Sequence, residues 1–314
     1  MQFPAAMENE KPRIVVIAGP TASGKTAVGI ELAEKLDGEI VSADSIQIYR
    51  FMNIGSAKPT VRERSRVPHH LVDICDPDEN FSAGDYVRVA RECIRGILER
   101  GRVPLVVGGT GLYIRLLLGG IAKMPPAQPR LRKQLRAEEL QKGQSTLFRR
   151  LAEVDPETAA VTQPSNLSRI IRSLEVFEST GKKISEIQKE HALQDRPYRT
   201  LFLSLDPGRS VLYERIDNRV DNMIKGGLLD EVAALYARGY RRELKSMQSL
   251  GYRHAGMILS GEVDTPEAVG LMKRDTRRYA KRQFTWFRSE PEVLWIGPEQ
   301  REDVGSVVDN FLGR

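Results

Sequence analysis

The chain has 314 residues, 40% of them hydrophobic, which is typical of a globular protein with one large or two modest domains. Its net charge of +6 and isoelectric point of about 9.3 suggest an anionic partner, although a merely solvated basic surface would give the same values. No apolar run approaches the ~20 residues of a membrane span, and the two cysteines lack metal-ligand spacing. We therefore expect a cytoplasmic protein without a membrane segment or a zinc site.

The first part of the chain alternates between short β-branched runs and helical periodicity. Strands and helices are predicted in turn at 13–18, 25–36, 39–43, 82–100 and 103–107. Ser82 has the chemistry of a helix N-cap. Such alternation favours a parallel sheet with helices on both faces.

The pattern changes at a proline-rich break, residues 124–129. Only helical periodicity follows until about residue 190. The elements predicted after it are a strand at 200–205, helices at 209–225, 228–238 and 266–287, and a last strand at 293–296. We therefore expect an α/β core, residues 1–122 and 200–314, interrupted by an all-helical insertion domain at 123–199.

Residues 19–26 read GPTASGKT and match the pattern G-x-x-x-x-G-K-[S/T] between a strand and a helix. The glycines allow a tight turn whose N–H groups point at phosphate oxygens, and the helix N-terminus adds partial positive charge. Lys25 is suited to neutralising bound phosphates, and the Thr26 hydroxyl to ligating magnesium. The motif predicts a site for a di- or triphosphate without indicating which.

Asp44 follows the second predicted strand, in the segment SADSIQIY at 42–49. Because the carboxyl ends of parallel strands face the ligand crevice, Asp44 should lie near the phosphate-binding loop. It could hold a metal, act as a general base or cap the next helix. Gln47 has an amide suited to the edge of adenine, but a solvated loop residue is an equally good interpretation.

A further strand-to-helix turn, GGTGLY at 108–113, leaves only Thr110 as a side-chain donor or acceptor directly after its glycine pair. ATPases commonly carry an acidic residue after such a strand to organise magnesium, so its absence argues against an ATPase. A purely structural glycine turn is the alternative.

The last long predicted helix carries a concentrated positive charge. One of its faces presents Arg274, Arg277, Arg278, Lys281 and Arg282, and Met272, Thr276, Tyr279, Gln283 and Trp286 lie roughly opposite. A second basic group, at the start of the insertion, consists of Arg130, Arg132, Lys133 and Arg136. Two separated cationic patches suit a polyanion longer than a nucleotide, with a solvated face as the alternative.

Taken together, these segments and others resemble the tRNA dimethylallyltransferase (tRNA isopentenyltransferase) family. The similar segments are AGPTASGKT at 18–26, SADSIQIY at 42–49, GGTGLY at 108–113, NLSRIIRSLEVF at 166–177, RIDNRVDNMIKGGLLDEV at 215–232, SLGYR at 249–253 and TRRYAKRQFTWFR at 276–288. Each segment alone is generic, but they run in family order along nearly the whole chain, and the set is highly specific.

The resemblance implies a fold and a reaction. The fold is α/β, a parallel-sheet core like that of P-loop nucleoside-triphosphate hydrolases with an inserted helical domain that contacts tRNA. The reaction transfers a dimethylallyl group from dimethylallyl diphosphate to the exocyclic N6 amine of the adenosine 3′ of the anticodon, in tRNAs that read codons beginning with U. Diphosphate is released and Mg²⁺ is required. We expect a monomer.

The resemblance also implies residue roles. The donor diphosphate would be held by Gly19, Thr21, Ala22, Ser23, Gly24, Lys25, Thr26 and Arg219, with Thr26 on the metal. Asp44 would be the general base and Thr110 would help to hold the base. The tRNA contacts would come from Asp44, Ser45, Ile46, Gln47, Thr110, Arg132, Asn166, Arg169, Arg278, Lys281, Arg282 and Gln283.

The chain departs from the family pattern in two places. Ile46 stands where the family often has methionine, a volume-conserving change, and Pro164-Ser165-Asn166 stands where Asn-Asp is common, which weakens the roles given to Asn166 and Arg169. Without the C-terminal zinc finger of eukaryotic relatives, the chain resembles bacterial members. Three alternatives stay open: a P-loop kinase of a small metabolite, an adenylate isopentenyltransferase that uses AMP, and a non-enzymatic RNA-binding protein.

Overall fold

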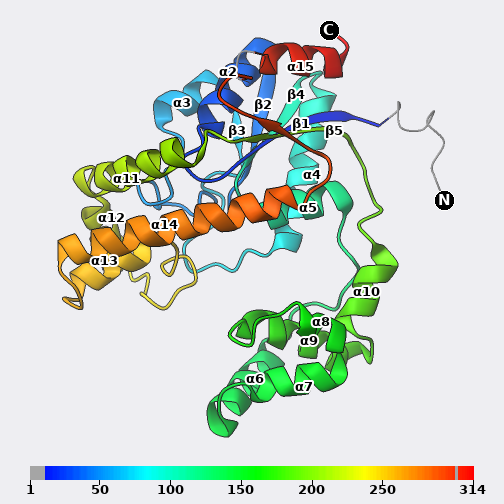
Figure 1. Cartoon of the computed structure of the whole chain (residues 1–314), viewed down its shortest axis with the longest axis vertical. Coiled ribbons are helices and arrows are strands. Elements are labelled where there is room, and N and C mark those ends of the chain that lie inside the picture. Colours follow the sequence, from blue (N-terminus) through cyan, green and yellow to red (C-terminus); the bar gives the residue numbers. More distant parts are fainter. Residues whose placement is uncertain (1–10, 301–302) are drawn as a thin grey trace. The chain divides into compact units, whose positions relative to one another are not determined.

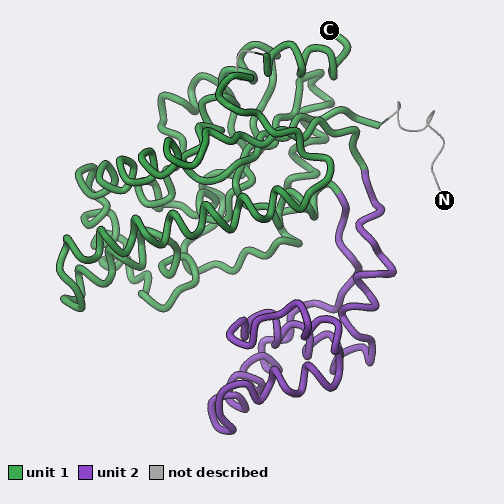
Figure 2. Tube along the Cα trace, in the orientation of Figure 1, with its two compact units in different colours: residues 1–118, 197–314 green, residues 119–196 purple. Residues whose placement is uncertain are grey.

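The computed structural model describes residues 11–300 and 303–314 and divides the chain into two compact units. One unit consists of residues 1–118 and 197–314, and the other of residues 119–196 (Figures 1 and 2). The sequence placed the helical segment at 123–199. Both boundaries of the unit lie a few residues earlier, and just inside them Gly119 O accepts a hydrogen bond from Asp195 N at 3.2 Å.

The larger unit is built on a six-stranded sheet in which every pair of neighbours is parallel. Its strands are β1 (Arg13–Ala18), β2 (Gly38–Ala43), β3 (His69–His70), β4 (Val103–Gly108), β5 (Arg199–Leu205) and β6 (Val293–Ile296), in the order β3-β2-β4-β1-β5-β6. The parallel α/β architecture expected from the sequence is thereby confirmed.

Helices cover both faces of this sheet, and β1 is buried on both sides, as its unbroken apolar run predicts. Val15 and Ile17 pack with α2 (Lys25–Leu36) and α15 (Val304–Leu312) on one face. Ile14 and Val16 pack on the other face with α4 (Ala83–Glu99), α5 (Gly111–Gly119) and the end of α14 (Thr265–Arg288). The predicted Ser82 cap is confirmed, because its hydroxyl accepts from Asp85 N at 3.2 Å.

A third packed cluster lies beyond the sheet. The helices α11 (Arg209–Lys225), α12 (Leu228–Ala237) and α13 (Tyr252–Leu259) pack with residues 48–52 and with Met272 of α14. The short α3 (Val61–Arg66) has no buried residue, and β3 has only two residues, so neither left a periodic signal in the sequence.

The smaller unit contains helices only. They are α6 (Pro129–Lys142), α7 (Thr146–Val154), α8 (Pro156–Ala160), α9 (Leu167–Thr180) and α10 (Ile184–His191). Their core is formed by leucines and isoleucines of α6, α7 and α9, such as Leu135, Leu151 and Leu174.

Candidate active site

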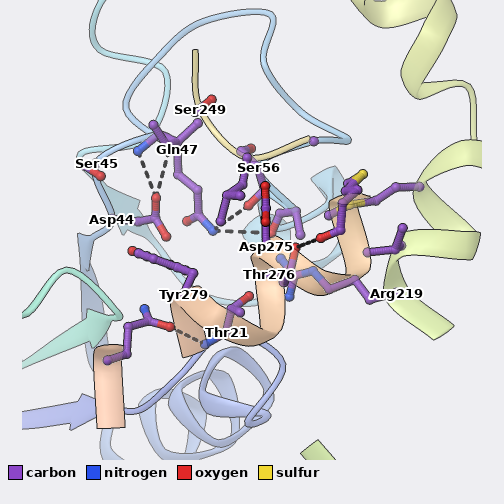
Figure 3. Close-up of a pocket in the computed structure, with 18 of the residues that line it drawn as sticks. Thr21, Asp44, Ser45, Gln47, Ser56, Arg219, Ser249, Asp275, Thr276 and Tyr279 are labelled. Atoms are coloured by element: carbon purple, nitrogen blue, oxygen red, sulfur yellow. Dashed lines mark hydrogen bonds between the residues drawn. The ribbon is translucent and has the colours of Figure 1, made fainter. Parts of the chain in front are cut away.

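The carboxyl ends of β1, β4 and β2 are neighbours in the sheet, so the loops that follow them meet at one edge. There the loops after β1 and β2 line a pocket of about 550 Å³, together with residues 55–57, residues 248–250, Arg253, α11 and α14. The pocket lies wholly within the larger unit (Figure 3). This volume is in the usual range for a site that holds a small organic molecule.

The loop after β1 has the backbone of an anion cradle. Gly19, Ala22 and Gly24 have φ values of 147°, 65° and 92°, so the chain reverses direction sharply within six residues. A side chain at Gly19 would bring its Cβ within 2.8 Å of Ser23 Oγ. Helix α2 then begins without a side-chain cap at Gly24, which leaves its first N–H groups available to an anion.

Lys25 lies at the bottom of this cradle, and its ammonium donates to Pro20 O at 3.3 Å. Burial lowers the pKa of Lys25 to about 8, although the nearby Asp44 carboxylate opposes that shift and Arg219 adds to it. Arg219 comes from α11, and burial lowers its pKa as well, again against Asp44. Among the described residues Arg219 has no hydrogen bond or ion pair. Two desolvated cations beside a single carboxylate favour the binding of a polyanion.

Asp44 stands at the end of β2 with one carboxylate oxygen engaged. Its Oδ1 accepts from Ile46 N at 2.9 Å and Gln47 N at 3.3 Å, so it caps a turn and no helix follows directly. Its Oδ2 has no partner among the described residues, and the residue lines the pocket (Figure 3). Capping and a chemical role are therefore compatible, because each uses a different oxygen.

Thr110 supports this turn from behind. Its Oγ1 accepts from Ser45 N at 3.1 Å, and its N–H donates to Ala43 O at 3.0 Å. Thr110 is absent from the pocket lining, and its position suits holding Asp44 and Ser45 in place; the expected contact of Thr110 with tRNA stays a prediction.

The two amides expected on the acceptor side are both occupied by the protein. Gln47 Oε1 accepts from Ser42 Oγ at 3.3 Å, and its Nε2 donates to the carbonyls of Ala57 at 3.3 Å and Ser56 at 3.5 Å. Gln283 is 6% exposed; it accepts from Thr21 N and donates to Gly109 O, both at 2.8 Å. Gln283 thus lines the pocket and forms a buried bridge between two loops of the site, and its expected contact with tRNA stays a prediction.

The basic residues of α14 differ in whether they form ion pairs within the protein or face the pocket and solvent. Arg277 pairs with Asp217 of α11 at 2.5 Å, so it does not belong to a free ridge. Arg278 and Arg282 line the pocket, and Lys281 is exposed with no partner among the described residues. Lys281 and Arg282 have no ion pair among the described residues, whereas the largely exposed Arg278 pairs with Asp275 at 3.6 Å.

The residues of the helical unit that were expected to contact tRNA differ in their hydrogen bonds and exposure. Arg132 donates to the fully buried carboxylate of Glu175 at 2.7 and 2.8 Å, while its own side chain is 40% exposed, so its expected tRNA contact stays a prediction beside this structural ion pair. Asn166 caps α9 by accepting from Arg169 N at 3.2 Å, and both side chains are exposed.

Sequence reasoning missed several residues of the pocket. Tyr279 was assigned to the packing face of its helix but lines the site, where burial and the Asp44 carboxylate raise its pKa, so it stays neutral. Asp275 lines the mouth and accepts from Arg253 at 2.8 Å. The SLGYR segment, which ends at Arg253, was the one signal that could have drawn attention to this wall.

The donor groups around the loop suit magnesium. The Thr26 hydroxyl and the Asp44 carboxylate line the same pocket, and both also border a small adjoining cavity of about 20 Å³. Such hard oxygen ligands match Mg²⁺, which characteristically takes few protein ligands and completes its shell with phosphate and water. The described residues contain no cluster of three or more histidine, cysteine or carboxylate side chains able to hold a metal alone.

Comparison with known proteins gives a consistent family. The family model described as IPP transferase matches residues 47–290, and the one described as isopentenyl transferase matches residues 12–72. The chain is 54% identical over 283 residues to the tRNA dimethylallyltransferase of Syntrophobacter fumaroxidans, covering 90% of this chain and 83% of the relative. It is 46% identical to that of Geobacter sulfurreducens, covering 96% and 98%.

Solved structures agree with these relatives. The tRNA isopentenylpyrophosphate transferase of Bacillus halodurans is 40% identical with a TM-score of 0.72, over 96% of this chain and 97% of that one. A eukaryotic dimethylallyltransferase acting on tRNA is 28% identical with a TM-score of 0.79, over 96% and 80%. Within the part of the chain that the structure describes, no helix is both long and apolar enough to cross a bilayer. The chain belongs to the tRNA dimethylallyltransferase (IPP transferase) family.

Proposed function

We propose that this protein transfers the dimethylallyl group of dimethylallyl diphosphate to the N6 amine of the adenosine 3′ of the anticodon, in tRNAs reading codons that begin with U. One observation carries the proposal: a phosphate cradle with two desolvated cations, Lys25 and Arg219, opens into the same pocket as the free oxygen of Asp44. A leaving-group site and a proton acceptor therefore face one space.

In the proposed reaction the bond between C1 of the donor and its diphosphate oxygen breaks while a bond from C1 to N6 forms. The N–H groups of the loop, Lys25 and Arg219 take up the charge that develops on the departing diphosphate. Bound Mg²⁺, held through Thr26 and the diphosphate oxygens, would supply further charge neutralisation. Asp44 Oδ2 accepts the proton that the amine loses.

The acceptor base must leave its stack to reach this pocket, at a cost of a few kcal/mol. Arg278, Lys281 and Arg282 supply phosphate contacts near the mouth that offset that cost. The helical unit presents further free cations, Arg130, Lys133, Arg136 and Arg169, which we propose also contact tRNA. The same proposal includes a monomeric, cytoplasmic enzyme and a phosphate-binding loop specialised for a diphosphate donor.

The test offers labelled dimethylallyl diphosphate to the purified protein with unmodified tRNA, with AMP, and without acceptor. We expect label on tRNA alone, in a reaction that requires Mg²⁺. Label on AMP in preference to tRNA would favour an adenylate isopentenyltransferase. Failure to transfer the label to either acceptor, together with phosphate transfer from ATP, would favour a kinase.

A further inference from the structure

One wall of the pocket is a chain segment that the proposed chemistry does not use. Residues 53–57 form this segment, which we name the lip. Gly55, Ser56 and Ala57 line the pocket directly. The carbonyls of Ser56 and Ala57 are the acceptors that hold Gln47 Nε2 (Figure 3). Whatever fixes the lip therefore also fixes Gln47, at the turn that Asp44 caps.

The lip is held by a residue about 175 positions away. Glu231 lies in the first turn of α12 and turns its carboxylate toward three successive N–H groups. Its oxygens accept from Asn53 N at 2.9 Å, from Ile54 N at 2.9 and 3.0 Å, and from Gly55 N at 3.3 Å. Hydrogen bonds from backbone N–H groups to an ionised acceptor are about twice as strong as neutral ones, so this is a strong anchor for a loop.

Tyr252, the first residue of α13, completes the arrangement. Its hydroxyl donates to Glu231 Oε1 at 2.6 Å, and the side chain is fully buried. Burial and the adjacent carboxylate raise the pKa of Tyr252, so the phenol remains a donor at any working pH. Its ring also lies against the lip, since a Cβ on Gly55 would come within 2.5 Å of Tyr252 Cε2.

A second anchor closes the base of the same segment. Lys58 is buried, and its ammonium donates to Tyr49 O at 2.7 Å, Asn53 Oδ1 at 3.0 Å and Asp73 Oδ1 at 2.5 Å. This set ties the lip to its own neighbours in the chain. Apolar contacts also join the lip to the α11–α14 side of the pocket, where Gly55 lies close to Leu228. Among the described residues, Glu231 is the residue of that side that holds the lip by side-chain hydrogen bonds, and Tyr252 supports it.

We propose that Glu231 and Tyr252 form a positioning clamp that sets the distance between the lip and the helical wall of the pocket, and thereby orients Gln47 and the Asp44 turn toward the acceptor adenine. The inference rests on the proposed function. The donor side should be largely independent of the clamp, because the phosphate-binding loop is held separately by Gln283. The clamp should therefore influence acceptor steps more than donor binding.

The test compares Glu231→Ala, Glu231→Gln and Tyr252→Phe with the parent enzyme. Displacement of a positioning group by about 1 Å can cost ~100-fold, so Glu231→Ala should lower kcat/KM for tRNA by about 10- to 100-fold. Glu231→Gln keeps one acceptor oxygen but presents an NH2 group to the remaining N–H donors, so it should fall between parent and Ala. Diphosphate affinity, measured by calorimetry, should stay within about threefold.

A matched control separates positioning from general stability. Glu39 is a buried carboxylate held by Arg100 and His70 at the start of β2, whereas the pocket lies at the other end of that strand. Glu39→Gln should lower the melting temperature without a selective change in kcat/KM for tRNA. Hydrogen exchange adds a readout that needs no activity: the amides of residues 53–55 should exchange faster in Glu231→Ala.

Two results would contradict the proposed positioning role of Glu231 and Tyr252. One is an unchanged kcat/KM for tRNA in a folded Glu231→Ala protein. The other is a loss of donor binding and of acceptor kinetics in equal proportion, with unchanged exchange at residues 53–55. By contrast, a parent enzyme that transfers no label to tRNA would refute the proposed function itself, and the positioning role with it.

Discussion

Replacement of Asp44 by asparagine tests the proposed proton acceptor with little disturbance to the structure. The amide oxygen of asparagine can still accept from Ile46 N and Gln47 N, so the turn after β2 should persist. The lost feature is the carboxylate oxygen that faces the pocket. General-base catalysis typically contributes ~10²–10⁴-fold, or about 3–5 kcal/mol in activation free energy. Single-turnover transfer should slow by that factor, with tRNA affinity within a few-fold.

The same substitution has a smaller effect on the donor side. Lys25 has a pKa of about 8, so at pH 7 about 90% of it is charged, and Asp44 is one of the groups that keeps it so. Removal of that charge lowers the pKa further and weakens donor binding by no more than a few-fold. Rates are measured across a magnesium titration. Rescue by added Mg²⁺ would point to a metal ligand, and a rate within threefold of the parent would remove Asp44 from the mechanism.

The remaining predictions concern charge. Lys25→Ala should weaken diphosphate binding by about 30- to 1000-fold while tRNA affinity in a filter assay stays within a few-fold. In the parent, diphosphate binding near pH 8.5 should be accompanied by proton uptake, because the bound anion favours the charged form of Lys25 that burial disfavours. Calorimetry in two buffers of different ionisation enthalpy measures the proton uptake, and equal binding heats in the two buffers would refute it. The double substitution Lys281→Gln and Arg282→Gln should reduce the slope of log affinity for tRNA against log salt concentration by up to ~0.9 per lost phosphate contact. An unchanged slope would indicate that both residues are merely solvated. Burial would raise the pKa of Glu175, but hydrogen bonds led by Arg132 lower it to about 2, so its stabilisation is present above pH ~4.5 and is lost as the pH falls toward 2. Urea unfolding should therefore show Arg132→Gln reducing that acid dependence, by on the order of 2 kcal/mol, and equal acid dependence in both proteins would contradict it.

Most of the fold could be predicted from local sequence patterns. The strands at 13–18 and 293–296 and the helices at 25–36 and 209–225 have the bounds that periodicity and end signals predicted. Each of these elements is decided by residues within itself. The two-residue β3 depends on pairing with β2 and left no local signal. Helix α3 has no buried residue, so it lacks apolar periodicity, and its one local signal is the capping box of Thr60 with Glu63.

The candidate site likewise has parts that the sequence predicts and parts that it does not. The phosphate-binding loop is a contiguous motif and was visible in the sequence, and Asp44 followed from strand order. The partners of Gln283 and Glu231 lie 262 and about 175 residues away, and the ion pair of Arg277 with Asp217 spans 60 residues. A helical wheel places such residues on a face but cannot tell which cations already have a partner. For this reason the expected ridge of five basic residues contains three that pair with carboxylates, Arg274, Arg277 and Arg278, and two without an ion pair among the described residues, Lys281 and Arg282.

The central claim is that one pocket brings an allylic diphosphate to the N6 amine of a tRNA adenosine. The most direct measurement is single-turnover transfer of labelled dimethylallyl diphosphate to two tRNAs that differ only in the nucleotide 3′ of the anticodon, adenosine in one and inosine in the other. Because inosine lacks the amine, we predict label on the first tRNA alone, located at that nucleotide. Equal labelling of both tRNAs, or label at another position, would contradict the account.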